Sequence, residues 1–143
     1  MASHHHLRFA GLRGPFLVGS VLLALTGCAK GSTGPSDGGP ATPGWLTVEL
    51  NTPNTDDGAV QLRVSGAQVD TVRVANAYQG FGVASSAGAD LVITGGVAKG
   101  VVAHLKVPDV NRSGRYTVSV VAAARRGSYE LRSLGEYRAA VVR

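Results

Sequence analysis

Residues 60–65 read VQLRVS, and apolar side chains alternate with polar ones at every position. The two valines and the leucine therefore fall on one side of an extended chain, and the three polar residues fall on the other. An alternation with a period of two is typical of a β-strand that buries one face. The pairs Asp57-Gly58 and Ser65-Gly66, which favour turns, bound this stretch. The sequence thus predicts a half-buried strand between two turns.

The same alternation recurs from Trp45 to the end of the chain. The stretches that carry it are residues 46–50, 60–65, 69–76, 78–84, 90–94, 101–107, 115–124 and 136–142. Turn-forming residues separate them, and only Tyr129–Leu134 could form a single helical turn. Many short strands without intervening helices predict an all-β domain, an antiparallel sandwich of about eight strands, with a barrel as the alternative.

The stretch 101–107 contains the only histidine after the first few residues of the chain. Alternation places Val101 and Leu105 toward the core and Val102, His104 and Lys106 on the other face. A single histidine without a second histidine or a cysteine beside it makes a poor transition-metal site. We therefore expect His104 to be an exposed residue of a sheet, and we expect no metal here.

The N-terminus has the three parts of an export signal. Arg8 and Arg13 supply positive charge, and an apolar core runs from Phe16 to Leu25. This core is too short for a membrane-spanning helix, which needs about 20 apolar residues. The sequence predicts a signal peptide over residues 1–27.

Residues 25–28 read Leu-Thr-Gly-Cys and resemble the lipobox of bacterial lipoproteins. The resemblance implies that the Cys28 thiol receives a diacylglyceryl group and that a peptidase cuts before it. Two acyl chains are enough for stable anchoring, since each buried methylene contributes about 0.8 kcal/mol. The membrane would thus be one partner, and the protein would lie in the bacterial cell envelope. Ala29 and Lys30 follow the cysteine in place of an aspartate, which favours the outer membrane where the cell has one.

Residues 28–44 combine the cysteine with a segment rich in Gly, Pro and Ser. Residues 29–44 contain no large apolar side chain, so they cannot offset their ordering entropy by burial, and we expect a flexible, disordered linker. A flexible chain of this length spans about 20–24 Å. The expected domains are a signal peptide at 1–27, the lipidated cysteine and linker at 28–44, and a β-sandwich at 45–143.

The segment from Asp109 to Val120 resembles the approach to a late strand in immunoglobulin-like sandwiches, where a tyrosine, here Tyr116, lies at a sheet corner. Together with the strand count, it is also similar to the bacterial surface sandwiches of carbohydrate-binding modules and cohesins. These resemblances imply an architecture and no particular activity.

The sequence offers little for catalysis. With one cysteine in the chain, a disulfide scaffold and a cysteine-ligated zinc site are excluded. Ser85, Asp90 and His104 follow the chain order of a hydrolase triad, but no helix follows the serine as a nucleophile elbow requires. The acidic turn around Asp56 lacks the spacing of an EF-hand. We predict no catalytic residues, no cofactor and no metal.

The last 19 residues carry five arginines and two tyrosines against two glutamates. Arginine can pair with a carboxylate or phosphate, and a tyrosine ring can stack on a sugar or peptide. We expect the loop from Arg125 to Tyr129 to contact an anionic envelope component, such as an acidic polysaccharide or a lipid headgroup. Nucleic acid is not an expected partner of an exported chain with mild net charge. The candidate partner-binding residues are Arg125, Arg126, Tyr129, Arg132 and Arg138.

These features together predict a lipid-anchored binding or adhesion module of the cell envelope without catalytic activity. Its β-sandwich would contact an envelope protein or a polysaccharide. The alternatives are a structural subunit of a larger surface assembly and a small envelope hydrolase.

Overall fold

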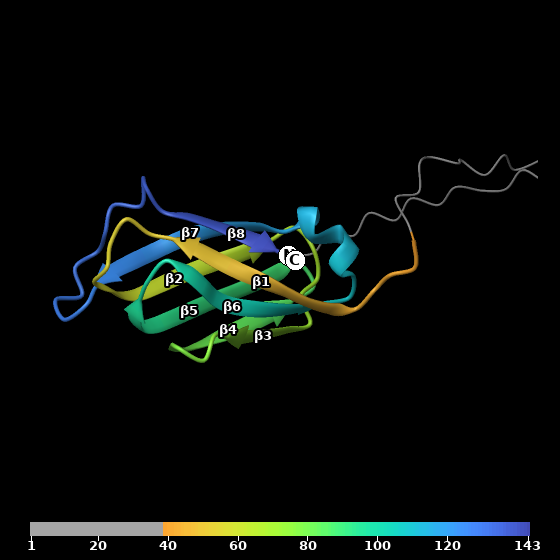
Figure 1. The fold of residues 1–143 in the computed structure, drawn as a ribbon, viewed down its shortest axis with the longest axis horizontal. Helices are drawn as coiled ribbons and strands as arrows, with labels where there is room; N and C mark the ends of the chain where they lie inside the picture. Colours follow the sequence, from red (N-terminus) through yellow and green to blue (C-terminus); the bar gives the residue numbers. More distant parts are fainter. Residues whose placement is uncertain (1–38) are drawn as a thin grey trace, which may run out of the picture. The chain divides into compact units, whose positions relative to one another are not determined.

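The computed structural model describes residues 39–143, which form two four-stranded antiparallel sheets packed into a sandwich (Figure 1). The elements are β1 (Gly44–Asn51), β2 (Asp57–Ser65), β3 (Thr71–Val74), β4 (Gln79–Ser85), β5 (Gly88–Val97), β6 (Gly100–Val107), the 3-10 helix η1 (Val110–Arg115), β7 (Thr117–Arg125) and β8 (Arg138–Val142). The predicted all-β sandwich is confirmed. The expected signal peptide, Cys28 and the linker up to residue 38 lie outside the described residues.

The strands pair as a nested set. Sheet A has the order β3-β6-β1-β8, and sheet B has the order β4-β5-β2-β7. Within the two sheets β1 therefore pairs with β8, β2 with β7, β3 with β6 and β4 with β5. The contacts of β1 with β6 and of β2 with β5 complete each sheet. Apart from β4 and β5, which form a hairpin in sheet B, consecutive strands lie in opposite sheets, so the connections between strands gather at the two ends of the sandwich.

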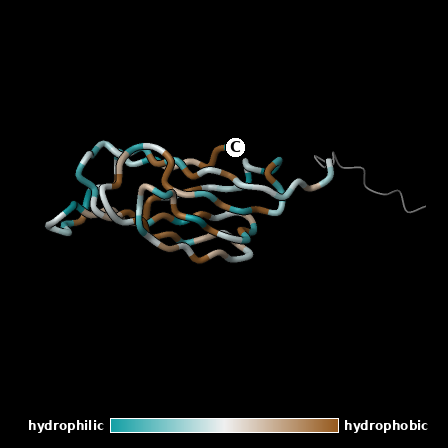
Figure 2. Tube along the Cα trace, turned by 60° about the horizontal axis from the view of Figure 1, so that its bottom comes forward, coloured by the Kyte–Doolittle hydropathy of each residue, from teal (hydrophilic) through white to brown (hydrophobic). Residues whose placement is uncertain are grey.

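The core lies between the sheets and follows the predicted alternation. Figure 2 shows hydrophobic residues alternating with hydrophilic ones along the strands. The large side chains that are almost completely buried include Leu46, Val48, Leu50, Val60, Leu62, Leu91, Ile93 and Leu105. Burying one such side chain contributes about 1.5–3 kcal/mol. The two faces expected from residues 46–50 and 60–65 are thus correct, and apolar packing supplies the core.

The alternation fails at the start of β6. Val48 pairs with Ala103, whereas the next residue, Glu49, pairs with Val101, so Val102 is an extra residue in the ladder. This β-bulge turns Val102 fully into the core and leaves Val101 40% exposed, the reverse of the sequence prediction. His104 lies on the outer face as expected and is partly exposed.

Residues 110–115 form a short 3-10 helix where the sequence predicted a turn followed by a strand. Asp109 caps this helix and also reaches back to the chain before β1. Its carboxylate accepts the backbone N–H of Asn111 at 3.0 Å and that of Thr42 at 3.2 Å. The Thr42 hydrogen bond holds the pKa of Asp109 below its usual value. The end of the expected linker is therefore attached to the domain, and β1 begins at Gly44.

The single helical turn that the sequence allowed at Tyr129–Leu134 does not form. Leu131 instead forms an isolated β-bridge with Ala124. Gly127 and Tyr129 have φ angles of 86° and 59°, which a right-handed helix does not accommodate. Residues 126–137, called the β7–β8 loop below, are therefore irregular apart from this bridge.

Tyr116 precedes β7 and is buried. Its hydroxyl donates a hydrogen bond of 2.7 Å to the carbonyl of Gln68, in the connection between β2 and β3. Burial raises the pKa of Tyr116 above its usual value. The side chain thus ties the start of sheet B's edge strand to a connection that leads into sheet A.

Candidate binding site at the β7–β8 loop

The structure gathers four of the five candidate residues at one end of the sandwich. Arg125 is the last residue of β7, and Arg126, Tyr129 and Arg132 belong to the β7–β8 loop. This loop lies at the end of the sheets opposite to residues 39–43 (Figure 1). Arg138 is the first residue of β8.

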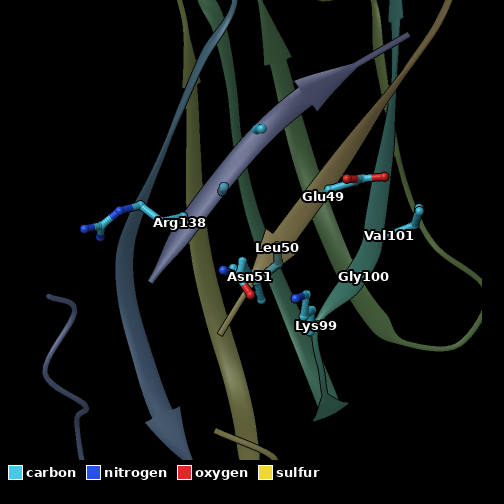
Figure 3. Close-up of a pocket in the computed structure, with 9 residues that line it drawn as sticks. Glu49, Leu50, Asn51, Lys99, Gly100, Val101 and Arg138 are labelled. Atoms are coloured by element: carbon cyan, nitrogen blue, oxygen red, sulfur yellow. The ribbon is translucent and has the colours of Figure 1, made fainter. Parts of the chain in front are cut away.

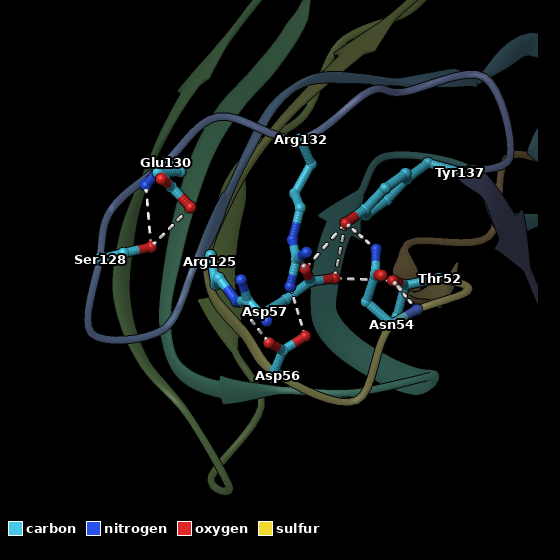
Figure 4. Close-up of polar contacts among 9 residues, drawn as sticks. All are labelled: Thr52, Asn54, Asp56, Asp57, Arg125, Ser128, Glu130, Arg132 and Tyr137. Carbon is cyan, nitrogen blue, oxygen red and sulfur yellow. Dashed lines mark hydrogen bonds and ion pairs between the residues drawn. The ribbon is translucent and has the colours of Figure 1, made fainter.

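Two of these arginines form ion pairs with the same aspartate, which lies far from them in the sequence. The Asp56 carboxylate accepts a hydrogen bond of 2.9 Å from Arg125 Nε and another from Arg132 Nη2 (Figure 4). The hydrogen bond from Arg125 is the main reason that the pKa of Asp56 lies below its usual value. Glu130 and Glu136, which the sequence suggested as the opposing charges, form no ion pair within residues 39–143.

Asp57 is the centre of a buried polar cluster beneath the loop. Its carboxylate is 0% exposed and accepts a hydrogen bond of 2.6 Å from Thr52 Oγ1. The Tyr137 hydroxyl lies 2.8 Å from both carboxylate oxygens and donates its proton to this group. The same hydroxyl accepts a hydrogen bond of 2.8 Å from Asn54 Nδ2 (Figure 4). Burial raises the pKa of Tyr137 above its usual value.

Arg132 joins Asp57 to Asp56. Its Nε atom is 3.3 Å from Asp57 Oδ1, while its terminal nitrogen binds Asp56. The Nε–H contact is an ion pair without good hydrogen-bond geometry. The side chain is 19% exposed, which shields it from a ligand. We therefore assign Arg125 and Arg132 to positioning of the loop, since their charges are already matched.

The sequence could not reveal this cluster. Strict alternation along the strand from Val60 would turn Gly58 and Asp56 toward the core, whereas the structure buries Asp57. A register shift between Asp57 and Ala59 causes the change. The polar side chains of the acidic turn around Asp56, which the sequence analysis compared with an EF-hand, have other partners. Residues 39–143 contain no group of three or more His, Cys, Asp or Glu side chains suited to a metal.

Arg126 and Tyr129 remain available at the surface. Arg126 is exposed and forms no ion pair within the part of the chain that the structure describes. Tyr129 is 79% exposed and is the sole residue other than glycine with a positive φ in residues 39–143. Such a backbone conformation costs about 1–3 kcal/mol and often marks a functional position. The N–H of Tyr129 donates to the carbonyl of Arg125 at 3.1 Å, which fixes the loop there.

Arg126 and Tyr129 border a pocket of about 330 Å³. Its other walls include Gly58, Thr94 and Gly95, from the paired ends of β2 and β5. A Cβ atom at Gly95 would meet nothing within 4 Å, so the absence of a side chain leaves this wall open. The volume is at the small end of the range for ligand pockets, about 300–1,000 Å³. The pocket therefore suits a small unit such as one sugar ring.

Arg138 borders a different hollow, on the outer surface of sheet A. This hollow has a volume of about 260 Å³ and is also lined by Glu49 and Lys99 (Figure 3). Figure 3 shows Glu49 and Arg138 extending away from each other. The Arg138 guanidinium donates to the carbonyls of Gly135 and Tyr137, both at 2.7 Å. The structure thus separates Arg138 from the pocket that Arg126 and Tyr129 share.

The triad order noted in the sequence has no counterpart in space. Ser85 pairs with Gly88 across the hairpin turn between β4 and β5, and Asp90 lies on β5 of the same sheet. His104 lies on β6 in the other sheet. Asp90 instead forms an ion pair of 2.8 Å with Arg63.

The described part of the chain is an antiparallel β-sandwich with a surface pocket at one end. No known protein family matches the chain, and no curated protein or solved structure matches it either. No helix within residues 39–143 is long and apolar enough to cross a membrane.

Proposed function

We propose that this protein is a lipid-anchored, non-catalytic binding module of the cell envelope. Cys28 would carry the anchor, as the lipobox resemblance implies. The pocket beside Arg126 and Tyr129 would bind the ligand, because it combines an unmatched cation, an exposed ring and a fixed backbone. The positions of two segments support this proposal: residues 39–43, which follow Cys28 in the sequence, enter at one end of the sandwich, and the β7–β8 loop that borders the pocket lies at the other end (Figure 1).

The chemistry of the pocket favours an acidic polysaccharide as the ligand. The planar guanidinium of Arg126 can form two parallel hydrogen bonds with a sugar carboxylate. The ring of Tyr129 offers an apolar face for stacking against a pyranose and a hydroxyl for hydrogen bonding. The cluster around Asp57 keeps the loop in place, which lowers the entropy lost on binding.

The test is the affinity of the full chain for acidic polysaccharide extracted from the envelope, measured by titration calorimetry. Arg126→Glu should weaken binding at least about tenfold, since it replaces a charge-assisted hydrogen bond with repulsion. Tyr129→Ala should also weaken binding, and raised salt should weaken the parent protein in the same direction. Changing Arg125 together with Arg126 would be less informative than changing Arg126 alone, because Arg125 pairs with Asp56.

Arg115→Glu is the matched control. Arg115 is exposed, forms no ion pair within residues 39–143, and ends η1, away from the pocket. The proposal predicts that this variant binds like the parent. Equal affinity of the parent and the folded Arg126→Glu variant would reject the pocket as the binding site.

A second candidate function is that of a structural subunit in a surface assembly. The observation that favours it is the edge strand β4, on which Phe81 and Val83 are 64% and 63% exposed. The unpaired backbone groups of an edge strand can pair with another chain, and exposed apolar side chains on that strand favour such a contact. Sedimentation of the parent and of Phe81→Ser would test it, with loss of larger assemblies in the variant as the expected result. A monomeric parent would contradict self-assembly through this edge.

A further inference from the structure

The outer surface of sheet A carries an aromatic and basic cluster at the end where the chain enters the domain. Two adjacent rows of the sheet form it. Lys106 on β6 pairs with Thr71 on β3 and with Trp45 on β1, and His104 pairs with Arg73 in the next row. We call these five residues the Trp45 face. The Arg73 guanidinium carbon lies 4.8 Å from the centre of the Trp45 ring, and Trp45 is 41% exposed.

The charges of the Trp45 face are not matched within the domain. The ion pairs of residues 39–143 join Arg63, Arg112, Arg125 and Arg132 to Asp56, Asp57, Asp90 and Asp109, and none involves this face. Two acidic residues lie nearby. Asp70 precedes β3 and accepts a hydrogen bond of 2.8 Å from the Gln68 amide, and Glu49 lies farther along β1, opposite Val101. Arg73 and Lys106 therefore present a positive surface beside an exposed indole.

The position of the Trp45 face in the chain bears on what it contacts. Trp45 is the second residue of β1, which begins at Gly44. Cys28, the expected site of lipid attachment, precedes Gly44 by a segment whose expected span is about 20–24 Å. An acyl chain on Cys28 would therefore keep this end of the domain within reach of the lipid headgroups, at a high effective concentration.

We propose that the Trp45 face lies against an anionic lipid bilayer and orients the domain on the membrane. The inference rests on the lipid anchoring contained in the proposed function. Arg73 and Lys106 would approach lipid phosphates, with their aliphatic stems along the surface. The Trp45 ring would enter the headgroup region, where one side of an indole is apolar and its N–H is hydrated. The pocket beside Arg126 would stay open, since it lies at the other end of the sandwich.

Trp45 is the only tryptophan of the chain, so tryptophan fluorescence reports on the Trp45 face alone. The full chain is incorporated into vesicles of phosphatidylcholine, with or without phosphatidylglycerol, and Trp45 emission is recorded. In the anionic vesicles the emission should shift to shorter wavelength, and salt should reverse the shift because it screens charge. In neutral vesicles the emission should stay that of the free domain.

Variants that each lose one positive charge distinguish an effect of the Trp45 face from an effect of the total charge of the protein. Lys106→Gln and Arg73→Gln should each weaken docking on anionic vesicles about fivefold. Arg63→Gln removes the same charge from sheet B and should have little effect. Identical emission in both kinds of vesicle, or an effect of Arg63→Gln as large as that of Lys106→Gln, would overturn the proposal.

Flotation with neutral vesicles distinguishes failure of the anchor from failure of docking. A chain anchored through Cys28 floats with neutral vesicles whatever its Trp45 emission. A chain that floats but shows no shift in anionic vesicles contradicts docking and leaves the anchor intact. A chain that does not float contradicts the anchor on which the proposal rests.

Discussion

The hydroxyl of Tyr137 should contribute strongly to the stability of the domain, through the buried polar cluster beneath the β7–β8 loop. Tyr137→Phe keeps the ring and creates no cavity, but it removes the hydrogen bond that Asp57 accepts in a fully buried position. A hydrogen bond to a charged group contributes about 1.5–3 kcal/mol. Asp57 keeps its contacts with Thr52 and Arg132, so we expect the free energy of unfolding to fall by about 2 kcal/mol. The melting temperature should fall by about 10 °C for a domain of this size.

Urea unfolding of the full chain, followed by Trp45 fluorescence, measures this loss. Tyr78→Phe is the matched control, because Tyr78 packs against the core and its hydroxyl forms no hydrogen bond within residues 39–143. The difference between the two variants isolates the hydrogen bond from the loss of an oxygen atom. A difference below about 0.5 kcal/mol would refute the view that Asp57 depends on Tyr137, since ordinary surface changes are of that size.

The same variant has a signature at alkaline pH. Burial raises the pKa of Tyr137 above 10.0, so the folded protein holds this proton more tightly than the unfolded chain does. The associated stability is present below about pH 10 and is lost as the pH rises through the folded pKa. Tyr137→Phe should therefore lose less stability above pH 10 than the parent does. An equally steep alkaline loss in both proteins would assign the effect to other groups.

Three further predictions concern the rest of the chain. Gly88→Ala should destabilise the protein by more than about 2 kcal/mol, because φ is +147° and a Cβ atom would lie 2.0 Å from the carbonyl oxygen of Val64; unchanged urea unfolding would contradict this. The hydrogen bond from the Thr42 N–H lowers the pKa of Asp109 below 3.8. The stability that ionised Asp109 contributes is therefore present above pH 3.8 and is lost as the pH falls through the folded pKa. Acid unfolding of Asp109→Asn should accordingly be less steep than that of the parent. Cys28→Ser should release the protein from membranes or leave its precursor uncleaved, and a processed variant that stays in the membrane fraction would contradict the lipobox assignment.

The strands were predictable because each buries one face. Residues 46–50 and 60–65 alternate without interruption, and the structure buries the expected sides. The alternation does not indicate which strands pair, since partners such as β2 and β7 are more than 50 residues apart. It also fails at bulges, where one extra residue exchanges the two faces, as at Val101 and Val102.

The candidate site was predictable in part. The high density of arginine and tyrosine near the C-terminus pointed to the loop that borders the pocket, and Arg126 and Tyr129 meet there. The pairing of Asp56 with Arg125 could not be predicted, because the two residues lie 69 positions apart in the sequence. Burial of Asp57 depends on a register shift, which leaves no mark in the pattern of residue types.

The most direct test of the binding proposal is a map of the contacts by nuclear magnetic resonance. Isotope-labelled full chain in detergent micelles is titrated with acidic envelope polysaccharide, and backbone amide shifts are followed. The proposal predicts that the changes are confined to residues that border the pocket, at positions 58, 59, 94, 95, 126, 127 and 129. The same titration of Arg126→Glu should give much smaller changes. Shifts that are absent from these residues, or that centre on another surface, would contradict the assignment of this pocket as the binding site.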